Sequence, residues 1–233
     1  MFRLKVDSAI FEKFPDYQAI VVYAAGLRRP AGAEDDSVQL LRAAERQARS
    51  VLTVEKLSEH PHISSWRAAY ASFGSKPSKY LCSVEALLKR TLKGNDLPDV
   101  GLLVNLYNAI SIRSVIPAGG EDWSQIRSDL VLHFAKGNEP FVARQMGEIA
   151  TEYPDAGEVV WSDSEGITCR RWNWRQCART AITDSTNTAY FVFDRLPGCS
   201  HDNLTQSAGQ IVELVKLYYP QADLSTDLLT AAG

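Results

Sequence analysis

Polar side chains interrupt an otherwise apolar segment at about Leu102 to Ser114. Asn105, Asn108 and Ser111 lie three residues apart, so a helix would place two amides and a hydroxyl on one face. Asparagine is a poor residue for a helix interior because its amide competes with the backbone for hydrogen bonds. Two of them on one face therefore indicate specific hydrogen bonds. The groups either tie down neighbouring loops or form the polar wall of a ligand pocket, and both interpretations stay open.

The residues after this helix extend the candidate site. A proline stops the helix and predicts a loop from Pro117 to Gly120. Two adjacent glycines would let a ligand approach the backbone closely. Arg113 precedes this loop and Asp122 follows it. The candidate substrate-binding residues here are therefore Asn105, Asn108, Ser111, Arg113, Gly119, Gly120 and Asp122.

A second candidate feature is the segment from Thr168 to Trp174, which we expect to be an alternating strand. One face would carry an arginine and an asparagine, and the other an arginine and two tryptophans. Interleaved arginine and tryptophan can stack on nucleobases, although the tryptophans can equally pack beneath a helix. We take Arg171, Trp172 and Arg175 as candidate contacts to a ribose, a phosphate or a base.

Familiar catalytic and cofactor motifs do not occur. Gly74 to Ser78 lacks the first glycine of a phosphate loop, and His60 to His62 offers two imidazoles without a third ligand. Neither a Gly-x-Ser-x-Gly elbow nor a dinucleotide fingerprint is found, and Cys169 and Cys177 are expected to be buried thiols. No metal, no cofactor and no covalent nucleophile are expected, and the catalytic residues stay unassigned.

Composition narrows the class of protein. The chain has 233 residues, 45% of them hydrophobic and 23% charged, and a net charge of −3. These values fit a globular domain and argue against a DNA-binding protein, so any RNA contact would be local. The four cysteines are dispersed, and no apolar run is long enough to span a membrane. We expect a cytoplasmic protein without a membrane partner.

Periodicity predicts an α+β fold with mixed or antiparallel sheets and packed helices, in one domain over residues 1–233. Strands are expected near 18–24, 130–134 and 189–193, with a hairpin from Glu158 to Asn173. Helices are expected from Ser37, near 63–73, over 83–90 and over 200–219, and residues 222–233 are expected to be a loose tail.

A series of short motifs lies in order along the middle of the chain: Trp66 to Tyr70, Phe73 to Tyr80, Ser83 to Arg90, Leu103 to Ser111, Pro117 to Asp122, Gly157 to Val160, and Arg171 to Arg175. Together they resemble the free-standing B3/B4-domain proteins, over about residues 66–193. This domain is named for the β subunit of phenylalanyl-tRNA synthetase, where it houses an editing site that hydrolyses wrongly charged aminoacyl-tRNA. Relatives often carry aspartate at the position of Asn105.

The resemblance implies an editing-type domain that hydrolyses the ester of a mischarged aminoacyl-tRNA through a positioned water, with the aminoacylated 3′ end as its partner. The chain is shorter than a whole synthetase and is not expected to charge tRNA itself. A non-catalytic module that binds tRNA or a free amino acid is the alternative, and a protein-interaction role with a degenerate pocket is a third possibility. The amino acid, the tRNA and the oligomeric state are left undetermined.

Overall fold

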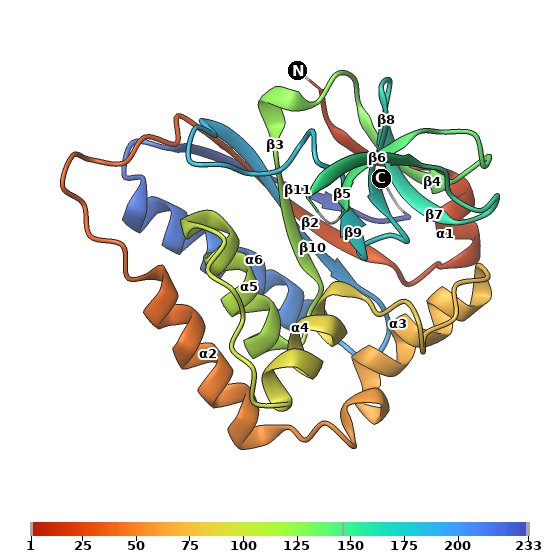
Figure 1. The fold of residues 1–233 in the computed structure, drawn as a ribbon, viewed down its shortest axis with the longest axis horizontal. Coiled ribbons are helices and arrows are strands. Elements are labelled where there is room, and N and C mark those ends of the chain that lie inside the picture. Colours follow the sequence, from red (N-terminus) through yellow and green to blue (C-terminus); the bar gives the residue numbers. More distant parts are fainter. Residues whose placement is uncertain (1, 146, 232–233) are drawn as a thin grey trace.

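The computed structural model describes residues 2–145 and 147–231. The helices are α1 (Ser8–Lys13), α2 (Ser37–Val51), α3 (Pro61–Ser72), α4 (Ser83–Leu92), α5 (Leu102–Ser114) and α6 (His201–Tyr218), with short 3-10 turns at Leu57–Glu59 and Trp123–Gln125. The strands are β1 (Leu4–Val6), β2 (Gln18–Ala25), β3 (Ala118–Asp122), β4 (Leu130–Phe134), β5 (Phe141–Gln145), β6 (Glu148–Glu152), β7 (Val159–Asp163), β8 (Gly166–Arg170), β9 (Arg175–Gln176), β10 (Thr188–Arg195) and β11 (Asp223–Leu229). The expected α+β fold with mixed sheets is confirmed (Figure 1).

One sheet is antiparallel and has the strand order β11-β2-β10-β3. Side chains alternate across it, so Phe191 and Phe193 of β10 lie on one face while Tyr190 and Val192 lie on the other. The first face packs against α5 and α6 in an apolar core that includes Ile211. In turn α2 lies against α5. The second sheet packs on the opposite face, which carries Tyr190 and Val192.

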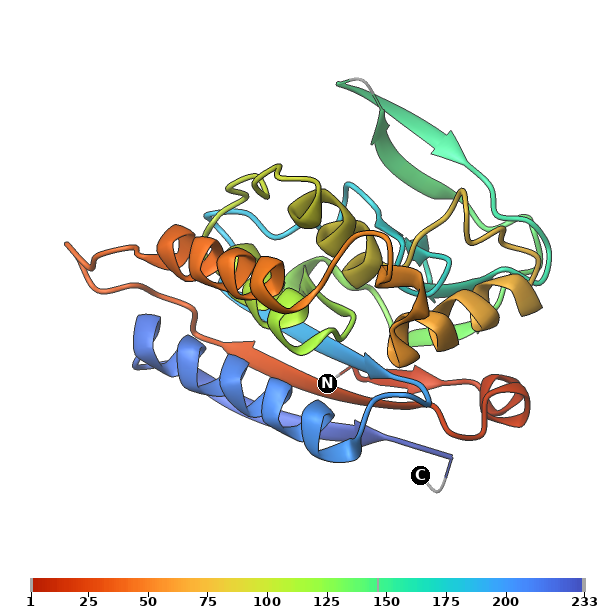
Figure 2. The ribbon, with the colours of Figure 1, turned by 90° about the horizontal axis from the view of Figure 1, so that it is seen from below.

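The second sheet has the order β1-β4-β7-β8-β9, in which only the β1–β4 pair is parallel. Its apolar residues join Tyr190, Val192 and the side chains of α3 and α4 in a second core around Trp66 and Trp172. The β5–β6 hairpin extends away from the rest of the fold (Figure 2). Apolar side chains thus fill the space between the two sheets, and α4 and α5 lie at its border.

The expected loop from Pro117 to Gly120 is wrong, because Ala118–Asp122 is β3, an edge strand paired with β10. Adjacent glycines suggested a turn, but Gly120 serves a close approach of two strands. A Cβ at that position would lie 2.8 Å from the Tyr190 carbonyl oxygen and 2.9 Å from the Phe191 Cδ1 atom. A glycine pair therefore fits an extended strand where another backbone comes near.

The expected strand from Thr168 to Trp174 ends early, because β8 stops at Arg170. Arg171 and Trp172 adopt φ values of 46° and 68°, which lie in the left-handed region. The Trp172 amide donates to the Val159 carbonyl at 2.7 Å, and the Arg171 amide donates to the Glu158 carboxylate at 3.2 Å. These hydrogen bonds to Val159 and Glu158 hold a turn at Arg171 and Trp172. The alternation of side-chain types along the sequence does not predict that turn.

The loose tail expected over 222–233 is also corrected. Residues Asp223–Leu229 form β11, which pairs antiparallel with β2 from Ala25 to Ala19. Residues 232 and 233 of that expectation lie outside the described residues. Within residues 2–145 and 147–231, none of the helices has both the length and the apolar character required to cross a bilayer.

Candidate functional site

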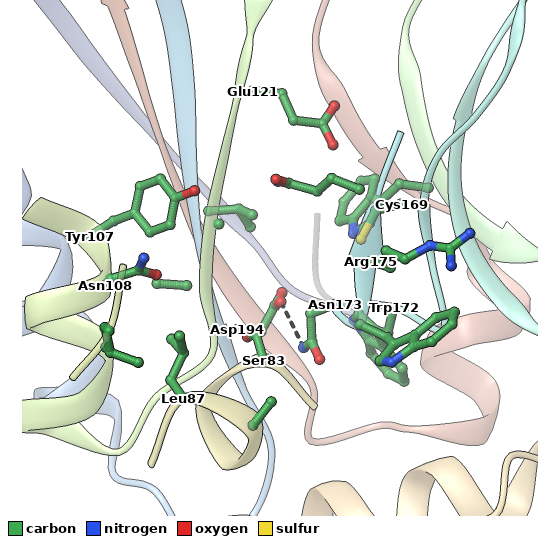
Figure 3. Close-up of a pocket in the computed structure, with 18 of the residues that line it drawn as sticks. Ser83, Leu87, Tyr107, Asn108, Glu121, Cys169, Trp172, Asn173, Arg175 and Asp194 are labelled. Atoms are coloured by element: carbon green, nitrogen blue, oxygen red, sulfur yellow. Dashed lines mark hydrogen bonds between the residues drawn. The ribbon is translucent and has the colours of Figure 1, made fainter. Parts of the chain in front are cut away.

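A cavity of about 430 Å³ lies between the two sheets and is bordered by α4 and α5 (Figure 3). Five aromatic residues line it among smaller apolar and polar ones: Tyr107 from α5, Trp161 from β7, Tyr190 from β10, and Trp172 and Trp174 from the turn after β8. Such walls exclude water and present π faces to a ligand. The polar groups among them therefore act in a low-dielectric setting.

Asp194 at the end of β10 is one of two buried carboxyl groups in the cavity wall, with 1% of its surface exposed. Its oxygens accept hydrogen bonds from the Tyr17 hydroxyl at 2.8 Å and from the Asn173 amide nitrogen at 3.1 Å. The Tyr70 hydroxyl donates to the side-chain Oδ1 of Asn173 at 3.0 Å and thereby fixes the orientation of that amide. Each carboxylate oxygen keeps one unused lone-pair site for a ligand or water.

Burial raises the pKa of Asp194 to about 6, and the bonds from Tyr17 and Asn173 oppose that rise. At neutral pH the group is mainly ionised and can still accept a proton. A base with a pKa just below the working pH suits proton transfer from water. Asp194 is thus held in a fixed orientation, and its pKa of about 6 suits a general base at neutral pH.

Glu121 on β3 is the second buried carboxyl group, with 0% of its surface exposed. Neither of its oxygens has a partner with hydrogen-bond geometry. Burial raises its pKa to about 7. The hydroxyls of Thr180, Tyr190 and Thr168 lie near enough to lower that pKa in part by polar attraction, although none of them meets the distance and angle of a hydrogen bond. Burying an ionisable carboxyl group without a hydrogen-bond partner lowers the free energy of unfolding. Buried groups with strongly perturbed pKa values are common in functional sites.

Two arginines and the amide of Asn108 also line the cavity. Arg90 of α4 is exposed and donates its Nε to the Asp96 carbonyl at 2.8 Å, while Arg175 is half-buried and paired with Glu152. Asn108 presents its amide beside Tyr107 in Figure 3, across the cavity from Trp172. Basic groups and amides therefore accompany the two carboxyl groups.

Four of the residues singled out from the sequence line this cavity: Asn108, Gly119, Trp172 and Arg175. Asn105 does not, because it is fully buried and its amide donates to Asp99 at 2.7 Å and to Ser37 at 3.2 Å. Ser111 likewise donates to the Ile116 carbonyl at 2.6 Å. At these two positions the polar helix face ties down neighbouring segments.

The remaining candidates also lie outside the cavity wall. Arg113 donates to Gln210 on α6 at 2.6 Å, and Asp122 accepts a bond of 2.7 Å from the Thr186 hydroxyl. Gly120 packs against β10 as described above. These residues connect elements around the cavity without facing it.

Arg171 is buried, with 3% exposure, and its surroundings are internal. Its Nη2 lies 3.2 Å from the Glu158 carboxylate, and its guanidinium carbon lies 3.7 Å from the Tyr80 ring centre and 4.7 Å from that of Trp174. Arg170 forms two further bonds of 2.9 and 2.8 Å with Glu158. The interleaved arginine and tryptophan segment is therefore a buried ion-pair cluster that supports the turn carrying Trp172.

Sequence reasoning did not assign Glu121 and Asp194 to the site. The available signal is an acidic residue on the face of a strand that otherwise carries apolar or small residues. Glu121 shares a face with Gly119, and Asp194 shares one with Val192 and Tyr190. That signal requires the strand assignment of residues 118–122, which the glycine pair obscured.

The B3/4 domain family matches residues 65–202. Because that match covers more than half of the chain, the protein belongs to the B3/4 domain family, as its motifs indicated. The chain is also similar to the solved N-terminal fragment of the phenylalanyl-tRNA synthetase β subunit from Pyrococcus horikoshii, with 11% identity, a TM-score of 0.48, and coverage of 96% of this chain and 52% of that one. It thus spans about half the length of that fragment. No match was found among curated proteins.

Proposed function

We propose that this protein binds an aminoacyl group, carried on the 3′ end of a tRNA, in the cavity between its sheets and hydrolyses the ester. The observation that carries the proposal is the buried, doubly hydrogen-bonded Asp194 in an aromatic cavity. Membership in the B3/4 domain family supports a substrate related to aminoacylation.

In the proposed reaction, Asp194 accepts a proton from a water molecule as the water oxygen attacks the ester carbonyl carbon. The bond from that carbon to the ribose oxygen then breaks, and the proton passes to the departing ribose oxygen. The products are a free amino acid and a tRNA with a free hydroxyl. Water suffices as nucleophile because an aminoacyl ester is an activated acyl group.

Other groups of the cavity support this chemistry. The amide of Asn108 can donate a hydrogen bond to the oxyanion that forms on the ester carbonyl. Cys169 lines the cavity as well, but burial raises the pKa of its thiol, so it stays protonated and is a weak nucleophile. Water activation by Asp194 is therefore favoured over a covalent thioester route.

In this proposal Arg90 and Arg175, which line the cavity, contact the phosphate or ribose of the acceptor end. The protein carries a net charge of −3, so these contacts would be local. Raising the salt concentration should then weaken tRNA binding only modestly, because few phosphate contacts release few counterions.

A specific observation favours binding of a free amino acid as the second candidate function. Arg170 and Arg171 are committed to Glu158, which leaves fewer cations for a nucleic-acid backbone. A small ligand needs no such surface. Thermal shift with the twenty amino acids and with uncharged tRNA separates the cases, since stabilisation by an amino acid without any hydrolysis supports the binding module.

The decisive test is incubation of the purified protein with a panel of misacylated tRNAs. Hydrolysis above the spontaneous rate for at least one of them is expected, and Asp194→Asn should lower it by about 100-fold or more. Asp16→Asn is the matched control, because Asp16 is exposed and lies outside the cavity wall. No acceleration for any tRNA in the panel would exclude the enzyme.

A further inference from the structure

Glu121 has a property that the proposed hydrolysis does not use. Its carboxyl group is fully buried, both oxygens lack a hydrogen-bond partner, and the residue belongs to the cavity wall. A buried ionised carboxylate without a partner is strongly disfavoured, and the surrounding side chains leave both Glu121 oxygens unsatisfied as acceptors. A ligand group that supplies hydrogen bonds and positive charge at this point would relieve the cost.

The register of the sheet separates this carboxyl group from Asp194. Glu121 pairs with Tyr190, whereas Asp194 lies four residues further along β10. Both face the cavity, and at about 3.3 Å per residue the two backbone positions lie about 13 Å apart along the strand. A ligand that uses both carboxyl groups therefore needs two polar ends separated by an apolar stem.

The walls around Glu121 also suit a cation. Tyr107 comes from α5 and Tyr190 from β10, and both aromatic rings line the cavity together with Trp161. Aromatic faces attract ammonium groups, and the attraction is stronger where water is excluded. Arg179 is the basic side chain that lowers the pKa of Glu121. Its guanidinium is already paired with Asp163 at 2.7 Å, so it does not form an ion pair with Glu121.

From this arrangement we infer that the Glu121 end of the cavity binds a side-chain ammonium group, so that the ligand is a basic amino acid or its aminoacyl ester. The inference rests on the proposed binding of an aminoacyl group in this cavity, but it does not require hydrolysis. The aromatic walls hold the aliphatic stem, and Glu121 pairs with the terminal ammonium.

The two ionisation states of Glu121 supply a signature of such binding. Burial raises the pKa of Glu121 to about 7, so this carboxyl group is partly protonated at neutral pH. The other titratable groups that act on it or face it are Tyr107, Tyr190, Cys169, Cys177 and Arg179. An ammonium beside Glu121 lowers its pKa, so binding should release a fraction of a proton near pH 7.

The test is calorimetric titration of the full chain with L-lysinamide and L-norleucinamide, which share the α-ammonium and the four-carbon stem and cannot act as ester substrates. Lysinamide should bind about tenfold or more tightly, because a charge-assisted bond to a buried carboxylate replaces a methyl contact. Both amides carry an α-amino group that itself titrates near this pH. Titration in two buffers of different ionisation enthalpy at pH 7 should therefore show more proton release for lysinamide than for norleucinamide.

Glu121→Gln should abolish both the preference and the excess proton release, whereas Glu213→Gln, at an exposed position of α6, should leave both unchanged. The wild-type comparison decides the question even if Glu121→Gln does not fold. Equal binding of the two amides would overturn the inference, as would equally tight binding of the 6-hydroxy analogue of norleucinamide without excess proton release.

Failure of this inference and failure of the proposed function remain distinguishable. Binding of lysinamide without hydrolysis of any misacylated tRNA supports the ammonium site and excludes the enzyme. Hydrolysis of tRNAs with uncharged side chains, together with no preference for lysinamide, excludes the ammonium site and supports the enzyme.

Discussion

Replacing Glu121 by glutamine should stabilise the protein at neutral pH and leave its stability nearly unchanged in mild acid. The substitution preserves the shape of a buried side chain but removes its ability to ionise. In the native protein the carboxyl group is fully buried and its oxygens have no hydrogen-bond partner. Burial raises its pKa from an ordinary value of 4.5 to about 7.

The magnitude follows from linkage between protonation and folding. Between about pH 4.5 and pH 7 the folded state binds more protons at Glu121 than the unfolded state does, so the free energy of unfolding falls as pH rises. Each unit of pKa difference corresponds to about 1.4 kcal/mol. The rise from 4.5 to about 7 therefore costs the wild type about 3 kcal/mol at pH 7.5, and the glutamine variant avoids this cost.

Urea unfolding of both proteins at pH 4.5, 6 and 7.5 measures the difference directly. The variant and the wild type should have similar midpoints at pH 4.5 and should diverge as pH rises, with the variant more stable. Glu213→Gln controls for the loss of a surface charge and should show no such divergence. A difference between Glu121→Gln and wild type that does not vary with pH would refute the reasoning.

Three further outcomes test other contacts. Asp194→Asn should lower the rate of deacylation by about 100-fold or more. In the wild type that rate should fall as pH drops through about 6, the pKa to which burial raises Asp194, which is measured with a misacylated tRNA across pH 5 to 8. Glu158→Gln leaves Arg170 without its buried partner and should lower the free energy of unfolding by about 3 to 5 kcal/mol in urea titrations. Gly120→Ala should destabilise by about 1 to 3 kcal/mol because its Cβ meets β10 at 2.8 Å, whereas Gly119→Ala, with 3.4 Å to Gln176, should be tolerated.

The stability costs at the two carboxyl groups support the assignment of the cavity as a site. Both Glu121 and Asp194 are held at raised pKa by burial, so each ionised carboxylate reduces the stability of the folded protein at neutral pH. Groups that reduce stability in the absence of a ligand are expected where binding or catalysis requires them. By contrast, Glu158 is buried but paired with Arg170 and Arg171, so it contributes to the structure of the turn.

The candidate site was predictable only in part. Asn108 was recognised because amide groups on a helix face at regular spacing can be identified from local sequence. Its neighbours Asn105 and Ser111 share that spacing but bind Asp99, Ser37 and the Ile116 carbonyl. Helical periodicity gives the face of a residue, while the segment that packs against each turn of that face depends on the tertiary fold.

The sequence by itself determined the local elements of this protein and its family. The helix over Leu102–Ser114, the strand over Leu130–Phe134 and the B3/4 motifs follow from spacing and residue type, because side-chain periodicity and stop signals act within a few residues. Only the tertiary structure decided that Gly120 lies in an edge strand and that the Arg171 side chain packs into a buried ion-pair cluster with Glu158.

The same distinction explains the cavity. Glu121 and Asp194 are far apart in the chain and meet the same space because β3 pairs with β10 in one register, and a shift of one residue would turn their side chains to the opposite face. That register, the packing of the second sheet over it and the burial that raises both pKa values are long-range properties. For this reason the polar helix after Leu102 was recognised in the sequence, whereas the place of Glu121 and Asp194 in the cavity wall was not.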